Sequence, residues 1–76
     1  MELDQFIKKF IEQFEETDVS LIDKDTKFKD IDEWSSLFAL TIIALADEEY
    51  EVRIKGDEIA KTNTVEELFE LIKSKK

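Results

Sequence analysis

The chain has no cysteine and no histidine, and these two absences exclude whole classes of chemistry. Without cysteine there is neither a disulfide framework nor a thiolate metal site. Without histidine there is neither imidazole acid–base catalysis nor imidazole metal ligation. Proline is also missing and glycine occurs once, at Gly56, which favours helices over a sheet rich in turns. No apolar run approaches the roughly 18 residues of a membrane span, and no signal-peptide pattern opens the chain, so we expect a cytoplasmic protein.

The size and charge of the chain restrict its partners. Its 76 residues suffice for one small domain, and 42% of them are apolar, which is too many for a disordered tail. The formal net charge of −9 argues against nucleic acid and against anionic membranes. It favours partner proteins with basic docking faces, although plain solubility would explain the same charge. We expect a monomer.

Two segments have the apolar spacing of amphipathic helices. The first covers residues 2–16, and Thr64 begins the second, with Glu67 three residues later completing a capping box. The first stripe consists of Leu3, Phe6, Ile7, Phe10, Ile11 and Phe14. The second consists of Val65, Leu68, Phe69 and Ile72, with Leu71 added to it. Both stripes are typical of core packing.

Residues 17–34 show no sustained period and are expected to form a long connection. We expect Leu21, Phe28 and Ile31 to anchor it to the core. The run from Asp23 to Lys27 resembles a calcium loop only faintly. It lacks the glycine and the terminal glutamate at the required spacing, so we expect no metal there.

The second helix along the chain is expected over residues 36–50, and it is apolar almost all round. One stripe can face the core, namely Ala39, Ile42, Ile43, Ala46 and Tyr50. A second stripe, formed by Leu37, Leu40 and Ala44 with Phe38 beside it, is then left toward the surface. It is either a docking face or a surface covered by the long connection, and the sequence leaves both open.

The remaining segment is short. Val52 and Ile54 are expected to point inward from a loop, Gly56 to allow a turn, and residues 57–61 to form one helical turn that holds Ile59. The prediction is a single all-α domain over residues 1–76. It is a small bundle of three main helices plus one short helix, with a long loop between the first two helices. Neither end has linker-like residues, which favours a free-standing protein.

A serine pair, Ser35 and Ser36, stands where the long connection ends and the most apolar helix begins. A helix start offers free backbone N–H groups and a positive dipole end, which suits a phosphate ester. A hydroxyl placed there can carry a phosphate-linked group without burying it. Simple N-capping explains a serine at this place equally well, but one serine suffices for a cap.

The chain resembles the acyl carrier protein family over essentially its whole length. That family has an Asp-Ser-Leu signature at the start of its second helix, where this chain reads Ser35-Ser36-Leu37. The large aromatic residue fourteen positions after the modified serine falls on Tyr50, and the hydrophobic pair that follows falls on Val52 and Ile54. The threonine-rich stretch before the last helix, the long loop and the acidic balance also agree.

The resemblance implies a covalent cofactor, 4'-phosphopantetheine from coenzyme A, on Ser36, because Leu37 follows it. Its terminal thiol would hold an acyl or aminoacyl group as a thioester for enzymes of fatty acid, lipid or secondary-metabolite biosynthesis. The implied partners are a phosphopantetheinyl transferase and acyl-loading and acyl-transfer enzymes. The chain itself would not be an enzyme. The docking residues would be Trp34, Ser35, Leu37, Phe38, Leu40, Thr41, Ala44, Asp47 and Glu48.

Two departures from the family pattern point away from housekeeping fatty acid synthesis. The aspartate before the modified serine is replaced by Ser35, and Phe38 and Thr41 stand where fatty-acid carriers usually have acids. A specialised acyl, aminoacyl or peptidyl carrier fits better. The alternative is a carrier-like helical module that binds a partner without being modified. A paired-acid enzyme is disfavoured because so small a bundle encloses little space, and Asp47, Glu48 and Glu49 fit a solvated helix end better than a calcium site.

Overall fold

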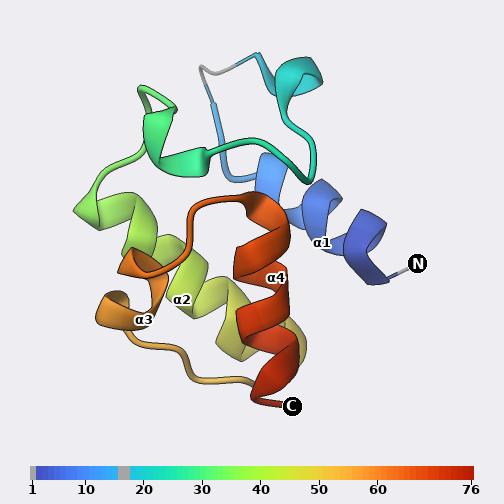
Figure 1. Ribbon diagram of the computed structural model, residues 1–76, viewed down its shortest axis with the longest axis vertical. Helices are drawn as coiled ribbons and strands as arrows, with labels where there is room; N and C mark the ends of the chain where they lie inside the picture. Colours follow the sequence, from blue (N-terminus) through green and yellow to red (C-terminus); the bar gives the residue numbers. More distant parts are fainter. Residues whose placement is uncertain (1, 16–17) are drawn as a thin grey trace.

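The computed structural model describes residues 2–15 and 18–76. Its elements are α1 (Glu2–Ile11), η1 (Val19–Leu21), η2 (Phe28–Asp30), α2 (Ser36–Tyr50), α3 (Gly56–Ala60) and α4 (Val65–Ser74) (Figure 1). The described residues contain no strand, and their one β contact is an isolated bridge between Lys27 and Thr64. The predicted all-α fold, with three longer helices, one short helix and a long connection after the first, is confirmed.

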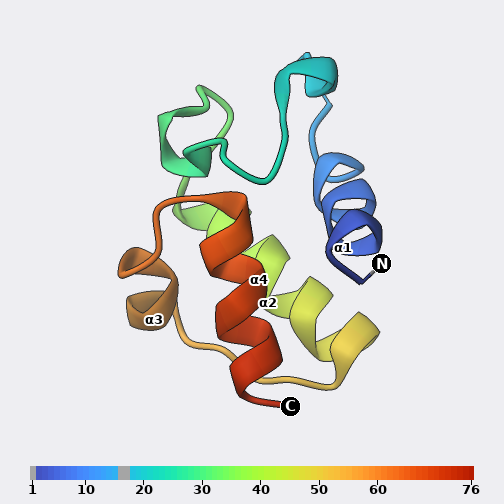
Figure 2. The same ribbon diagram turned by 45° about the vertical axis from the view of Figure 1, so that its right-hand side comes forward.

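The core lies between α1, α2 and α4, with α1 packed against α4 and α2 packed against α3 (Figure 2). Phe6, Phe10 and Phe28 are completely buried. The Phe6 ring centroid lies 5.6 Å from that of Phe69 and 6.0 Å from that of Phe10. A third contact of 5.3 Å joins Phe10 to Phe14. Side chains of this size bury a large apolar area, so this aromatic row forms a central part of the core.

The first helix is shorter than predicted. It ends at Ile11 rather than at residue 16, and Glu16 itself lies outside the described residues. The side-chain amide of Gln13 donates to the Lys9 carbonyl at 3.1 Å. If the helix continued, this carbonyl would accept from the backbone N–H of Gln13 itself. The Gln13 N–H donates instead to the Phe10 carbonyl at 3.1 Å, which tightens the last turn. Phe14 remains buried despite lying beyond the helix.

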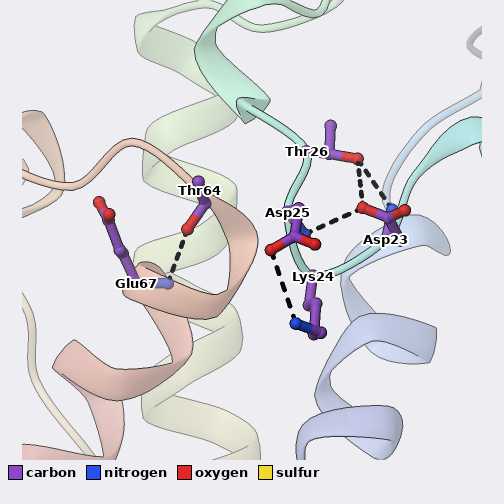
Figure 3. A network of polar contacts seen from close by, with 6 residues as sticks. All are labelled: Asp23, Lys24, Asp25, Thr26, Thr64 and Glu67. Carbon is purple, nitrogen blue, oxygen red and sulfur yellow. Dashed lines mark hydrogen bonds and ion pairs between the residues drawn. The ribbon is translucent and has the colours of Figure 1, made fainter.

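The long connection is joined to the start of α4 by backbone hydrogen bonds. The N–H of Val65 donates to the Thr26 carbonyl at 3.1 Å, and the N–H of Glu66 donates to the Lys24 carbonyl at 2.9 Å. Thr64 Oγ1 accepts from the N–H of Glu67 at 3.2 Å (Figure 3). These are N–H groups that a helix start leaves without intrahelical partners. The connection therefore completes α4 and is held in place by it.

A turn centred on Asp23 shapes this part of the connection (Figure 3). Its carboxylate accepts from the N–H of Asp25 at 2.9 Å, and its own N–H donates to Thr26 Oγ1 at 2.8 Å. Lys24 and Asp25 form an exposed ion pair at 3.6 Å. The polar residues of the faint calcium-loop pattern thus make a hydrogen-bonded turn.

The predicted anchors of the connection are correct in part. Phe28 is completely buried and Ile31 is partly buried against the core. The prediction that Leu21 anchors the connection was wrong, because its surface is 76% exposed. The neighbouring Ile22 is buried instead. Leu21 ends the 3₁₀ turn of η1, and the chain leaves this turn with the side chain of the next residue directed inward.

The segment between α2 and α4 follows the prediction except at the bounds of its short helix, α3, which runs over Gly56–Ala60 rather than over residues 57–61. Val52, Ile54 and Ile59 are buried as expected. Gly56 is the first residue of α3 rather than part of a preceding turn, because the N–H of Lys55 already donates to the Glu58 carboxylate at 2.9 Å across the start of the helix.

The cap of α4 also differs in one detail. Thr64 is the N-cap as predicted, but the Glu67 carboxylate accepts from the N–H of Asn63 at 2.7 Å instead of from Thr64. The stripe of Val65, Leu68, Phe69 and Ile72 is buried, and Leu71 is partly buried.

Candidate functional site

Ser35 is the N-cap of α2, as its position predicts. Its backbone is extended, with φ −154° and ψ 175°, and its Oγ accepts from the N–H of Phe38 at 3.2 Å. Its carbonyl accepts from the N–H of Ala39 at 3.0 Å, which closes the first helical turn. The capping requirement of this helix is met by Ser35 alone, so the hydroxyl of Ser36 is not needed for it.

Ser36 is the first residue of α2, and it is exposed. Its hydroxyl makes no hydrogen bond with another described residue, and the N–H groups of Ser36 and Leu37 have no acceptor within the same part of the chain. The first turn of α2 contains no acidic residue. The hydroxyl is therefore accessible at the positive end of a 15-residue helix dipole, with unused backbone donors beside it.

Ser36 opens onto a cavity of about 350 Å³ between the start of α2 and α3. The lining residues are Lys29, Trp34, Ser35, Ser36, Ala39, Gly56, Ile59 and Ala60. Lys29 is the charged residue of this wall. Its Nζ donates to the Ala60 carbonyl at 2.5 Å and lies 5.8 Å from the centroid of the Phe28 ring. The cavity thus combines a hydroxyl, a fixed cation and an apolar wall.

Trp34 and Phe38 are less available for docking than the sequence suggested. The Trp34 centroid lies 4.7 Å from that of Phe28 and 5.3 Å from that of Phe38. Phe38 also stacks on Phe14 with a centroid distance of 4.4 Å. Both residues are half-buried against the core. The expected position of Phe38 in a surface stripe was wrong, because α1 ends early enough for Phe14 to cover its ring.

The exposed face of α2 consists of Leu37, Leu40, Thr41, Ala44, Asp47 and Glu48. Leu37 is 73% exposed and Leu40 is 61% exposed, so the long connection does not cover them. The opposite face is buried at Ile42, Leu45 and Ala46. Leu45 was missing from the predicted core stripe. The other members of that stripe, Ala39, Ile43 and Tyr50, are partly buried.

The structure adds one site residue that the sequence analysis did not find, and that residue is Lys29. It belongs to the connection, where no periodic pattern identifies contacts. It lines the same cavity as the serine pair, and its Nζ is bonded to the last residue of α3. Within residues 2–15 and 18–76, no three acidic side chains form a metal-binding group. None of the described helices is long and apolar enough to cross a bilayer.

Comparison of the chain with family models, with curated proteins and with solved structures finds no match.

Proposed function

We propose that this protein is a carrier that holds 4'-phosphopantetheine on Ser36 and presents an acyl or aminoacyl group to partner enzymes. One observation carries the proposal. The capping of α2 is performed by Ser35, while the adjacent Ser36 hydroxyl is exposed and makes no hydrogen bond with a described residue. A second hydroxyl at a helix start that is already capped is unnecessary for folding and well placed for modification.

The surroundings of Ser36 fit a phosphate diester. Free N–H groups at the start of α2 and the helix dipole favour a negative charge there. Lys29 contributes a cation in the wall of the same cavity, and its ammonium keeps further N–H donors beyond the one directed at Ala60. The apolar part of this wall, formed by Ala39 and Ile59 among others, would contact the uncharged part of the arm.

Loading needs no catalytic group in this chain. The Ser36 oxygen forms a bond to the phosphorus that bears the pantetheine arm of coenzyme A, adenosine 3',5'-bisphosphate leaves, and the transferase accepts the serine proton. A serine hydroxyl needs such an external base to act as a nucleophile. The arm supplies a terminal thiol for thioester chemistry, and Ser36 fixes the point from which it extends.

The exposed face of α2 is the proposed docking surface for the transferase and the loading enzymes. Leu37 and Leu40 provide an apolar contact directly after Ser36, and Asp47 and Glu48 provide negative charge farther along the helix. A partner with an apolar patch flanked by basic residues would match this order. The cargo and the pathway, whether fatty acid, lipid or secondary metabolism, follow from the identity of that partner.

The test is intact-mass spectrometry after incubation with coenzyme A, magnesium and a broad-range phosphopantetheinyl transferase. The wild-type protein and Ser35→Ala are expected to gain one 4'-phosphopantetheine, and Ser36→Ala is expected to gain none. The Ser35→Ala variant is the matched control because it removes the neighbouring hydroxyl. Failure of the wild type with several transferases would contradict the proposal, and a gain that persists in Ser36→Ala would move the attachment to Ser35.

A second candidate function is an interaction module that binds its partner through α2 without modification. The observation that favours it is the exposure of Leu37 and Leu40, which supports docking whether or not Ser36 is modified. The mass of the protein purified from a host that has a transferase separates the two. An unmodified mass, with Ser36→Ala binding partners as well as wild type, favours the module.

A further inference from the structure

The connection between α1 and α2 contains a larger cavity, of about 580 Å³, away from the exposed face of α2. The segments that line it are the cyan and green ones in Figure 1. Its lining residues are Asp18, Leu21, Ile22, Thr26, Asp30, Ile31, Asp32 and Glu33. They come from η1 and the residues on either side of it, from the stretch before η2, from the end of η2 and from the turn after it. The proposed role of Ser36 uses none of them.

Among the described residues, this lining carries four carboxylates and no basic residue. Asp18 is held in place by Ser20, whose hydroxyl donates to Oδ1 at 2.6 Å and whose N–H donates at 3.1 Å. These hydrogen bonds lower the pKa of Asp18, and the bond from the Ser20 hydroxyl has the larger effect. The Asp18 carboxylate is therefore ionised at neutral pH. Glu33 Oε2 accepts from the N–H of Glu15 at 3.0 Å.

Two lysines of the same connection have other partners. Lys24 pairs with Asp25, and Lys29 donates to the Ala60 carbonyl. Asp30 and Asp32 are exposed, and neither forms an ion pair with a described residue. Lys27, the third lysine of the connection, does not line the cavity, so no cation of the described residues lies within ion-pair distance of these two carboxylates.

The rest of the lining is apolar. Ile22 is buried, Ile31 is half-buried, and Leu21 stands at the rim with most of its surface exposed. An apolar floor with carboxylates around it matches a side chain with an apolar stem and a cationic end. Arginine fits better than lysine, because its planar guanidinium can donate to two carboxylates at once and is the more weakly hydrated cation.

We propose that this cavity docks an arginine side chain of a partner protein, with its aliphatic stem over Ile22 and Ile31 and its guanidinium between Asp30 and Asp32. The site is independent of the proposed modification, since it involves neither Ser36 nor the exposed face of α2. Asp32 lies four residues before Ser36, so a partner docked here is held beside the start of α2.

The test is an NMR titration of the full ¹⁵N-labelled protein with the peptide acetyl-Leu-Arg-Leu-amide. The citrulline peptide acetyl-Leu-Cit-Leu-amide is the control, because it keeps the shape of the arginine side chain and removes its charge. Saturable amide shifts within residues 18–33 are expected with the arginine peptide alone. Equal shifts with the citrulline peptide, shifts centred on α2, or no saturable shift at millimolar peptide would each overturn the proposal.

Matched variants test the assignment to individual residues. Asp30→Asn with Asp32→Asn is expected to weaken binding by about fivefold, the size of one exposed ion pair. Asp4→Asn with Glu70→Gln removes the same charge outside the cavity and is expected to leave binding unchanged. The ¹⁵N spectrum of each variant reports its folding in the same experiment.

Two further outcomes would count against the proposal. Equal weakening in both double variants would show that net charge, and not the cavity, attracts the peptide. Calcium chloride that produced the same shifts at the same concentration as the arginine peptide would reassign the cavity to a metal cation.

Discussion

Replacing the two adjacent serines one at a time separates the hydroxyl that caps α2 from the one proposed to carry the modification. Ser35→Ala removes the oxygen that accepts from the N–H of Phe38 at 3.2 Å. Loss of a serine N-cap costs about 1 kcal/mol. In a domain of this size, about 1 kcal/mol lowers the melting temperature by about 4–8 °C. We therefore expect a clear destabilisation of Ser35→Ala.

Ser36→Ala is expected to behave differently, because its hydroxyl has no hydrogen-bond partner among the described residues and is exposed. Alanine is the better helix former by up to about 0.5 kcal/mol, so the melting temperature should stay the same or rise slightly. Thermal and urea unfolding of the unmodified proteins, followed by the helical signal in far-ultraviolet circular dichroism, gives both values. If Ser36→Ala were destabilised as much as Ser35→Ala, the assignment of the cap to Ser35 alone would be refuted.

Three further changes have definite expected outcomes. Glu51 has φ 56° in the left-handed region at the end of α2, so Glu51→Gly should stabilise the fold by about 1 kcal/mol and raise the urea midpoint. The pKa of Glu58 is lowered, mainly by its hydrogen-bonded ion pair with Lys75 at 2.7 Å. The ionised Glu58 carboxylate therefore stabilises the fold fully above pH 4.5, which is the ordinary pKa of a glutamate. This stabilisation is lost as the pH falls through the lower pKa of Glu58 in the folded protein. Melting curves of wild type and Glu58→Gln should differ at neutral pH and converge in acid. Leu37→Ser with Leu40→Ser should change the melting temperature by less than about 4 °C, because both side chains are exposed, and should raise the KM of the transferase with little change in kcat.

The helices were predictable because their signals are local. The apolar stripe of α4 and the Thr64 cap lie within a few residues of one another, and so do Ser35 and the start of α2. The end of α1 was not predictable in the same way. It depends on the Gln13 side chain competing for the Lys9 carbonyl, a choice that periodicity does not encode.

The sequence predicted the serines of the candidate site but not the residues that surround them. The division between Ser35 as cap and an exposed Ser36 follows from capping preferences that act over three residues. The contribution of Lys29 depends on α3 lying beside η2, a contact between residues 31 positions apart. The burial of Phe38 similarly depends on where α1 ends and Phe14 turns inward. Such contacts come from tertiary packing, for which a single sequence has no short-range pattern.

The indole of Trp34 gives the protein a built-in optical reporter. It is the single tryptophan of the chain, it is half-buried between Phe28 and Phe38, and it directly precedes the serine pair. Any ligand or protein that settles on this end of α2 alters the polarity around the indole. Its emission wavelength would then follow the proposed loading and docking in real time, without an added dye.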